Sequence, residues 1–246
     1  MKTLNRTRTL FAVHVLLLLF NCYAEAQTRQ RRPPQGGRIA IVVDERLSAL
    51  RATPDLSGRL LQRISRGRLV AILARRLTSD GILFYRVRVT RRTQGWLQKE
   101  ALVSASVPGD DRTLLSLVQT SQEFDRLARA KIFLDTFPHS PLRPQVLLLY
   151  GETAEISAAR LSREAARRLD LPQASAGAPE SSYFLNYSGL DRYNRQGVRF
   201  VFDRRARQFH YDGRAWREII ARYPRSAEAI EARKQLDSLT AVSSRW

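Results

Sequence analysis

Hydrophobic and polar positions follow a strand pattern in the first part of the chain and a helical pattern further on. Between residues 38 and 106, short runs of β-branched and aromatic residues are separated by turn signals such as Asp80-Gly81. Residues 84–89 (FYRVRV) alternate with a period of two, which places Tyr85, Val87 and Val89 on one face. This pattern predicts a small all-β unit of several short strands over residues 38–106.

After a short linker at residues 107–112, the period changes, and we expect a mainly helical domain over residues 113–240. Residues 171–182 form a low-complexity linker within it. Residues 133–140 and 219–226 share the order apolar-apolar-x-x-aromatic-Pro-x-Ser. Proline ends a helix, and serine caps the next one. Each stretch therefore predicts a helix–turn–helix hairpin capped by Ser140 or Ser226, with Pro141 at the first helical position after Ser140.

Two further patterns indicate how this helical part is filled. Small and apolar residues recur at helical spacing through residues 146–169 and predict a buried stripe: Val146, Tyr150, Ala154, Ser157, Ala158, Leu161, Ala165 and Leu169. Residues 198–202 and 208–211 predict an inserted β-hairpin. Its alternation places an aromatic set on one face: Phe200, Phe202, Phe209 and Tyr211.

The first 26 residues have the order of a secretory signal peptide. Basic residues precede an apolar run of eleven residues, and Ala24-Glu25-Ala26 supplies a cleavage site before Gln27. The run is shorter than the about 20 residues that span a bilayer. A buried N-terminal helix is the alternative, and acylation of Cys22 would make the protein a lipoprotein. Residues 27–37 form a Pro/Gly-rich flexible linker.

Arginine dominates the charge of the chain. The net charge is +19, and 38 of the 42 basic residues are arginines. Removing residues 1–26, which hold three basic residues and one acidic residue, leaves +17. A basic exported protein favours acidic partners, such as anionic polymers, lipid head groups or acidic proteins, over nucleic acid. A solvated cationic surface without a dedicated partner, produced by codon bias, is the alternative.

Candidate catalytic residues are few. The only cysteine is Cys22, so cleavage after Ala26 would exclude thiol nucleophiles and thiolate metal sites. His139 and His210 remain, 71 positions apart and without a carboxylate at zinc-ligand spacing. His210 alternates away from the aromatic face, which predicts a solvent-facing side chain. No nucleophile elbow, phosphate loop or dinucleotide motif occurs. We therefore expect no enzyme activity, no cofactor and no metal.

The β segment resembles the bacterial SH3-like (SH3b) domains of exported wall-associated proteins. The residues that carry this resemblance occur in the family's order: Leu50-Arg51, Pro54, Gly67, Phe84-Tyr85-Arg86-Val87 and Gly95-Trp96. The family usually has Trp where this chain has Phe84. The resemblance implies a partly open barrel of five or six strands that binds wall peptides or partner proteins.

Alternation places Phe84, Arg86 and Arg88 on the face opposite the core. An outward aromatic ring beside two guanidinium groups could stack on a ligand and bind a carboxylate. The alternative is an edge strand protected by charge. With Arg51 and Trp96, which the resemblance suggests, the expected ligand-binding residues are Arg51, Phe84, Arg86, Arg88 and Trp96. For Trp96 and Tyr85 we favour a place in the core over ligand binding, although in a small barrel either residue can do both.

The helical hairpins resemble tetratricopeptide-like hairpins of exported bacterial proteins, although the two copies lie 86 residues apart. Such hairpins bind proteins in helical grooves. The combined expectation is an exported, non-catalytic binding or scaffold protein of the bacterial cell envelope, periplasmic or extracellular, with no transmembrane helix after cleavage. The alternatives are a cell-wall hydrolase accessory, a cryptic carboxylate hydrolase and a structural envelope lipoprotein.

Overall fold

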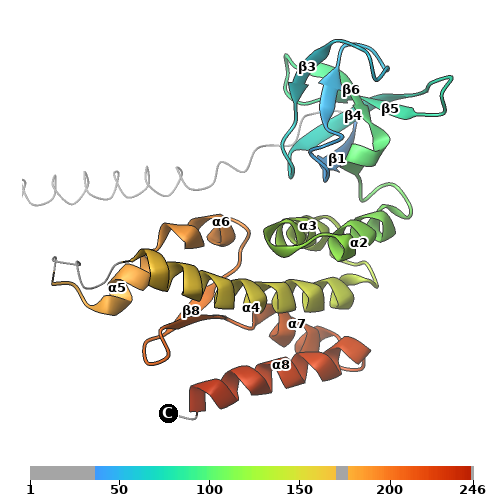
Figure 1. The fold of residues 1–246 in the computed structure, drawn as a ribbon. Helices are drawn as coiled ribbons and strands as arrows, with labels where there is room; N and C mark the ends of the chain where they lie inside the picture. Colours follow the sequence, from blue (N-terminus) through green and yellow to red (C-terminus); the bar gives the residue numbers. More distant parts are fainter. Residues whose placement is uncertain (1–36, 170–176, 245–246) are drawn as a thin grey trace, which may run out of the picture.

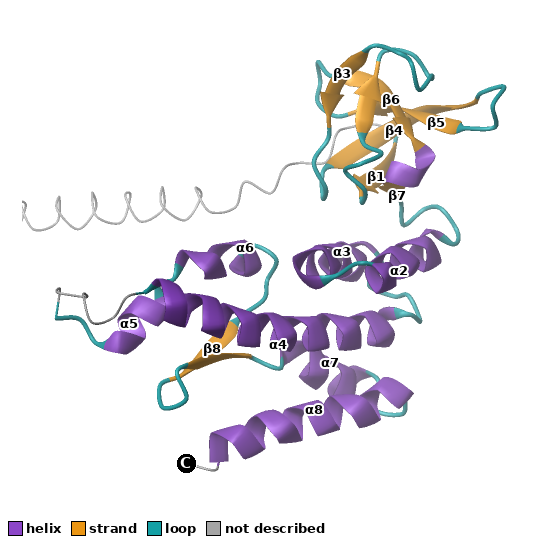
Figure 2. Cartoon of the chain, in the orientation of Figure 1, coloured by secondary structure: helices purple, strands orange, loops and turns teal. Residues whose placement is uncertain are grey.

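The computed structural model describes residues 37–169 and 177–244. An antiparallel sheet forms the N-terminal part and a mainly helical region follows it, with one small additional hairpin (Figures 1 and 2). We call residues 37–106 the sheet region, and residues 107–169 and 177–244 the helical region. The predicted signal peptide with Cys22, the cleavage site at Ala26 and Gln27, and the linker up to residue 36 lie outside the described residues.

The sheet region contains seven strands and one short 3-10 helix, η1, Lys99–Ala101. The strands are β1 Arg38–Val42, β2 Ala49–Arg51, β3 Leu60–Arg63, β4 Leu69–Leu77, β5 Leu83–Arg88, β6 Gln94–Gln98 and β7 Leu102–Val103. Their order in the sheet is β3-β2-β6-β5-β4-β1-β7. The sheet has more strands than the five or six that the resemblance implies, because very short strands such as β2 and β7 also join it.

The sheet curls on itself (Figure 1), and its core consists of aliphatic side chains. This core includes Val42, Leu50, Val70, Val87 and Leu97, so β1, β2, β4, β5 and β6 all contribute to it. The predicted alternation is confirmed for Val87 and Val89, which are buried, and Tyr85 packs against the same core.

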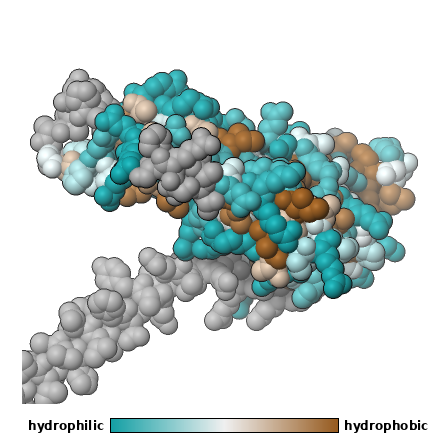
Figure 3. Space-filling view, turned by 90° about the horizontal axis from the view of Figure 1, so that it is seen from below, coloured by the Kyte–Doolittle hydropathy of each residue, from teal (hydrophilic) through white to brown (hydrophobic). Residues whose placement is uncertain are grey.

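The helical region consists of eight helical segments and the two-stranded hairpin. They are α2 Asp110–Thr120, α3 Glu123–Thr136, α4 Arg143–Arg168, α5 Glu180–Leu185, η3 Ser188–Leu190, α6 Asp191–Asn194, β8 Phe200–Asp203, β9 Gln208–Tyr211, α7 Arg214–Arg222 and α8 Ala227–Ser244. No helix in the described ranges is long and apolar enough to cross a membrane. Seen from below in Figure 3, the surface is mainly hydrophilic, with several separate hydrophobic patches.

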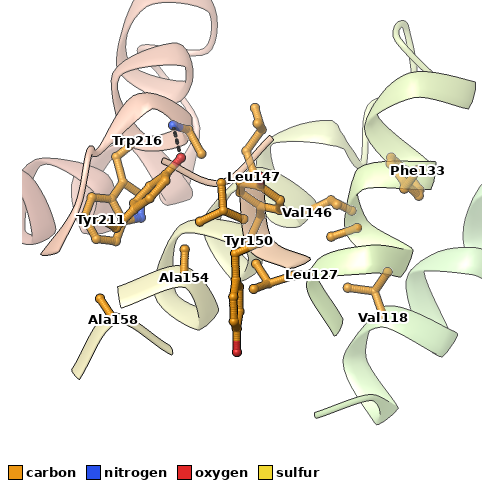
Figure 4. Close-up of a cluster of buried hydrophobic side chains, with 14 of the residues drawn as sticks. Val118, Leu127, Phe133, Val146, Leu147, Tyr150, Ala154, Ala158, Tyr211 and Trp216 are labelled. Carbon is orange, nitrogen blue, oxygen red and sulfur yellow. Dashed lines mark hydrogen bonds between the residues drawn. The ribbon is translucent and has the colours of Figure 1, made fainter. Parts of the chain in front are cut away.

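Helix α4 is the centre of the helical region, with α2 and α3 on one side and α7 and α8 on the other (Figure 1). The predicted stripe of small and apolar residues on α4 is confirmed. All its members from Val146 to Ala165 are buried, and Leu169, its last member, packs against the same core. Figure 4 shows this stripe between the side chains of α2 and α3 and those of Tyr211 and Trp216. The ring of Trp216 lies directly against Gly151, where a Cβ atom would come within 2.4 Å of its Nε1.

Both predicted helical hairpins form, but only one has the predicted cap. Ser226 precedes α8, and its Oγ accepts a hydrogen bond from the Ala229 N–H at 3.2 Å, as predicted. The prediction for Ser140 and Pro141 is wrong because α4 begins at Arg143, with Pro144 in its first turn. Ser140 instead accepts from the Leu142 N–H and donates to the Asp111 carboxylate, which joins the turn to α2.

Two predicted linker segments are partly helical. Helix α2 begins at Asp110, inside the expected linker at residues 107–112. Asp110 is buried, accepts a hydrogen bond from the Ser104 N–H at 2.8 Å and lies 3.5 Å from the Lys99 Nζ. Helix α5 begins at Glu180, inside the expected linker at residues 171–182. In both places an acidic residue starts a helix, where its charge is favourable.

The inserted hairpin is confirmed. Phe200 pairs with Tyr211 and Phe202 with Phe209, so the four aromatic side chains share one face, which packs against the helical core. The expectation that His210 faces solvent is wrong. His210 does alternate away from the aromatic face, but its Nδ1 lies 2.9 Å from a Glu155 oxygen, and its side chain is only 21 % exposed. Helix α4 therefore covers part of this second face.

The sheet region contacts the helical region through a buried junction. Val43 and Val103 belong to the helical core. Arg129 of α3 is buried, donates a hydrogen bond from Nε to the Val43 carbonyl at 3.2 Å and lies 3.7 Å from the Asp44 carboxylate. Hydrogen bonds from Arg46, with a smaller contribution from Arg129, hold the pKa of Asp44 below its usual value. Asp44 is therefore the ionised centre of this junction.

Candidate ligand-binding face of the sheet

A row of three predicted side chains crosses the middle of the sheet. Arg51 on β2 lies opposite Trp96 on β6, and Trp96 lies opposite Arg86 on β5. Directly opposed residues of antiparallel strands project from the same face, with Cβ atoms about 5 Å apart. Their neighbours Leu50, Leu97 and Val87 are buried in the core, so this row lies on the outer face. One indole ring therefore lies between two guanidinium-bearing side chains.

The other two predicted residues occupy neighbouring rows of the same face. Phe84 lies two residues before Arg86 on β5, opposite Gln98. Arg88 lies two residues after Arg86, opposite Gln94. All five predicted ligand-binding residues thus lie on one face of β2, β6 and β5.

The prediction that Phe84 points outward to a ligand is wrong in one respect. Its face is as predicted, because Phe84 does not belong to the core that surrounds Val87. However, its side chain is only 1 % exposed. The loop at residues 52–59 and the turn at residues 78–82 fold over this end of the face. Alternation predicts on which face of the sheet a side chain lies. Whether that side chain is exposed depends on which other segments of the chain cover the face. Phe84 therefore forms part of the floor of a cleft and offers no open stacking surface.

This cleft has a volume of about 530 Å³ and lies between the loop and the turn. Its apolar lining residues are Pro54, Leu56, Leu77, Ile82 and Phe84. Its polar lining residues are Thr53, Asp55, Arg76, Thr78, Ser79 and Asp80. Leu56 and Leu77 line the cleft and remain 48 % and 66 % exposed. Apolar and charged side chains thus both line the cleft.

Local hydrogen bonds hold both walls of the cleft in place. The Arg51 Nη1 donates to the Gly58 carbonyl at 2.8 Å, and the Ala52 N–H donates to the Arg59 carbonyl, so the loop is fixed at its base. In the other wall, the Thr78 N–H donates to the Ile82 carbonyl at 2.9 Å. Hydrogen bonds from Ser57 lower the pKa of the Asp55 carboxyl, which keeps this rim residue ionised.

Sequence reasoning missed the cleft residues outside β5. The available signal was the pair of leucines, Leu56 and Leu77, next to turn-forming residues, where apolar side chains have little reason to occur. These two leucines line the same cleft because two segments about 20 residues apart in the sequence come together. Alternation within one strand cannot predict that contact.

The face is suited to an anionic and partly apolar ligand. Arg51, Arg76, Arg86 and Arg88 place four positive charges on it, around Trp96 and the cleft. Guanidinium groups bind carboxylates through two parallel hydrogen bonds, and an indole ring adds stacking area.

Other candidate chemistry is sparse among the described residues. They contain no group of three or more His, Cys, Asp or Glu side chains that could hold a metal ion. His139 lies in the turn before α4, far along the chain from the paired His210 and Glu155. No protein-family model matches this chain, and no significant match was found among curated proteins or solved structures.

Proposed function

We propose that this protein is an exported, non-catalytic binding or scaffold protein of the bacterial cell envelope, and that its sheet region is an SH3-like domain that binds a wall peptide or a protein partner. The observation that carries this proposal is the single outer face on which the Arg51–Trp96–Arg86 row adjoins the cleft above Phe84. The curled seven-stranded sheet around one small core supports the domain type.

The geometry of the face suggests which part of a ligand it would contact. Phe84 and Arg86 are two residues apart on β5, which corresponds to about 7 Å along a strand. An extended peptide could place an apolar side chain in the cleft and a carboxylate about two residues away against Arg86 and Arg51. Acidic peptides of this kind occur in cell walls and in protein termini alike, and the exposed Leu56 and Leu77 would be covered on binding.

The test compares variants of the purified protein in sedimentation with purified wall and in pull-downs from envelope extract. R51Q together with R86Q should weaken binding at least tenfold, since each charged hydrogen bond contributes about 1.5–3 kcal/mol. Trp96→Ala should weaken it without changing charge. The matched control is R63Q together with R75Q, which removes the same charge from exposed positions outside the row.

Two results would oppose the proposal. If the control pair weakens binding as much as R51Q with R86Q, the attachment follows net charge and not this face. If the unaltered protein sediments with neither wall nor any envelope partner at low salt, the sheet face is not a binding site. Phe84→Ala is unsuitable as a binding probe because it removes a buried side chain.

A further inference from the structure

A second pocket lies in the helical region, at the C-terminal end of α4. It has a volume of about 420 Å³. The end of α4 forms one wall with Glu164 and Arg168, and the segment around η3 and α6 forms the other with Asp191, Arg192 and Arg195. The pocket shares no residue with the sheet region.

Three arginines line this pocket: Arg168, Arg192 and Arg195. Neither Arg168 nor Arg195 forms a side-chain ion pair within residues 37–169 and 177–244. Of the two acidic lining residues, Glu164 lies 3.7 Å from the Arg160 guanidinium, which offsets its charge. Unpaired cations that converge on one concave surface favour an anionic ligand.

The third arginine is fixed in place by aromatic rings. The Arg192 guanidinium lies 5.3 Å from the ring centre of Phe124 and 4.9 Å from that of Tyr193. Its Nη2 donates to the Tyr193 Oη at 3.1 Å, and Arg160 donates to the same oxygen at 2.6 Å. Because Tyr193 is fully buried, this guanidinium is held before any ligand arrives, which lowers the entropic cost of binding.

The floor of the pocket depends on a glycine. A Cβ atom at Gly189 would come within 2.3 Å of the Tyr187 ring, so the ring occupies the space that any side chain would need. The adjacent Ser188 hydroxyl also lines the pocket. Tyr187 is buried and lines the pocket together with this glycine.

We propose that this pocket binds a phosphate ester. A carboxylate has two oxygens, which one guanidinium fork satisfies, whereas a phosphate monoester offers three charged oxygens and a charge near −2. Arg168, Arg192 and Arg195 together match that group. Asp191 and Glu164 then accept hydrogen bonds from hydroxyl groups carried by the same molecule. The phosphate comes either from a soluble ester or from a lipid head group.

The experiment is calorimetric titration of the purified full chain with inorganic phosphate, glycerol 3-phosphate and glycerol. Glycerol 3-phosphate should bind more tightly than inorganic phosphate, and glycerol should not bind. R168Q together with R195Q should weaken binding of glycerol 3-phosphate at least tenfold. The control R163Q together with R199Q removes the same charge from exposed positions outside the pocket and should change binding less than twofold.

A vesicle arm separates the two sources of phosphate. Vesicles of phosphatidylcholine with phosphatidic acid present the same monoester at a membrane surface. Binding to them that is lost in R168Q with R195Q assigns a lipid head group, and binding of the soluble ester alone assigns a soluble ligand. The proposal is overturned if neither phosphate nor its esters bind, or if the control pair loses binding as much as the pocket pair.

Discussion

Both regions of this protein are rich in arginine, but they differ in net charge and in how the arginines are arranged. Residues 37–106 contain fourteen Lys and Arg against five Asp and Glu, a net charge of +9. Residues 107–169 and 177–244 contain twenty-one Lys and Arg against sixteen Asp and Glu, which gives a net charge of +5 in a region nearly twice as long. In the helical region, ion pairs join separate elements, as Arg143 does with Glu218 at 2.8 Å and Arg207 with Glu180 at 2.7 Å. In the sheet region, Arg51, Arg76 and Arg86 share one outer face.

This difference shows that an arginine-rich composition does not by itself determine whether the arginines form ion pairs within the protein or remain at its surface. Where acidic residues are interspersed, arginine connects helices, and its charge is locally offset. Where they are scarce, the charge remains at a surface and is available to a partner.

The cores of the two regions also differ. The sheet core holds small aliphatic side chains, whereas the helical core contains an aromatic cluster that includes Phe133, Tyr150, Phe209, Tyr211 and Trp216. Large aromatic side chains bury more area each. We infer that the helical region contributes most of the free energy of unfolding. The junction at Arg129 then couples unfolding of the sheet region to that of the helical region.

The largest expected effect follows from Trp216→Ala. Trp216 is fully buried, lies against Gly151 and packs edge-on to Tyr211 at 5.4 Å between ring centres. Loss of a buried tryptophan should lower the free energy of unfolding by about 3–5 kcal/mol, measured by urea denaturation followed by circular dichroism. Trp96→Ala, on the outer sheet face, is the matched control and should cost clearly less. Equal costs would contradict the assignment of Trp216 to the helical core and of Trp96 to the outer face of the sheet.

A smaller effect is expected from Arg129→Met, which removes the central side chain of the junction. The Val43 carbonyl would lose its side-chain donor and Asp44 one of its two cations, so we expect a loss of about 1–3 kcal/mol. Unfolding should be followed with one signal from the sheet region and another from the helical region. The unaltered protein should show one shared transition, and R129M should show two. Arg112→Met, at an exposed position in α2, should leave the transition unchanged. A single shared transition in R129M would show that the regions are coupled elsewhere.

The smallest effect concerns Glu152 of α4, whose pKa is raised by burial and, to a lesser degree, by the charge of Glu231. A carboxyl with a raised pKa in the folded state binds its proton more tightly there. Its ionisation therefore costs stability as the pH rises from about 4.5 through the raised pKa. Glu152→Gln should raise the unfolding temperature at pH 7 and leave it unchanged near pH 3. A decrease at pH 7 would contradict this assignment.

Local patterns in the sequence were sufficient for much of the fold. The aromatic pairs of the inserted hairpin, the α4 stripe and the cap at Ser226 all follow from periods and residue types within about 20 positions. The same holds for the common face of Phe84, Arg86 and Arg88, because alternation along β5 assigns these side chains to one face, whereas strand pairing brings Arg51 and Trp96 to it. These features depend on backbone geometry that neighbouring residues decide by themselves.

Only the tertiary structure decided which of those faces is covered. Phe84 has the predicted face but lies under a loop and a turn, and His210 has the predicted face but meets Glu155 of α4. Asp110 became the start of a helix because Ser104 and Lys99 bind it. Both pockets likewise join segments that are distant in the sequence. The physical reason is that a period specifies direction within one element, whereas burial and pairing depend on what the rest of the chain brings against it.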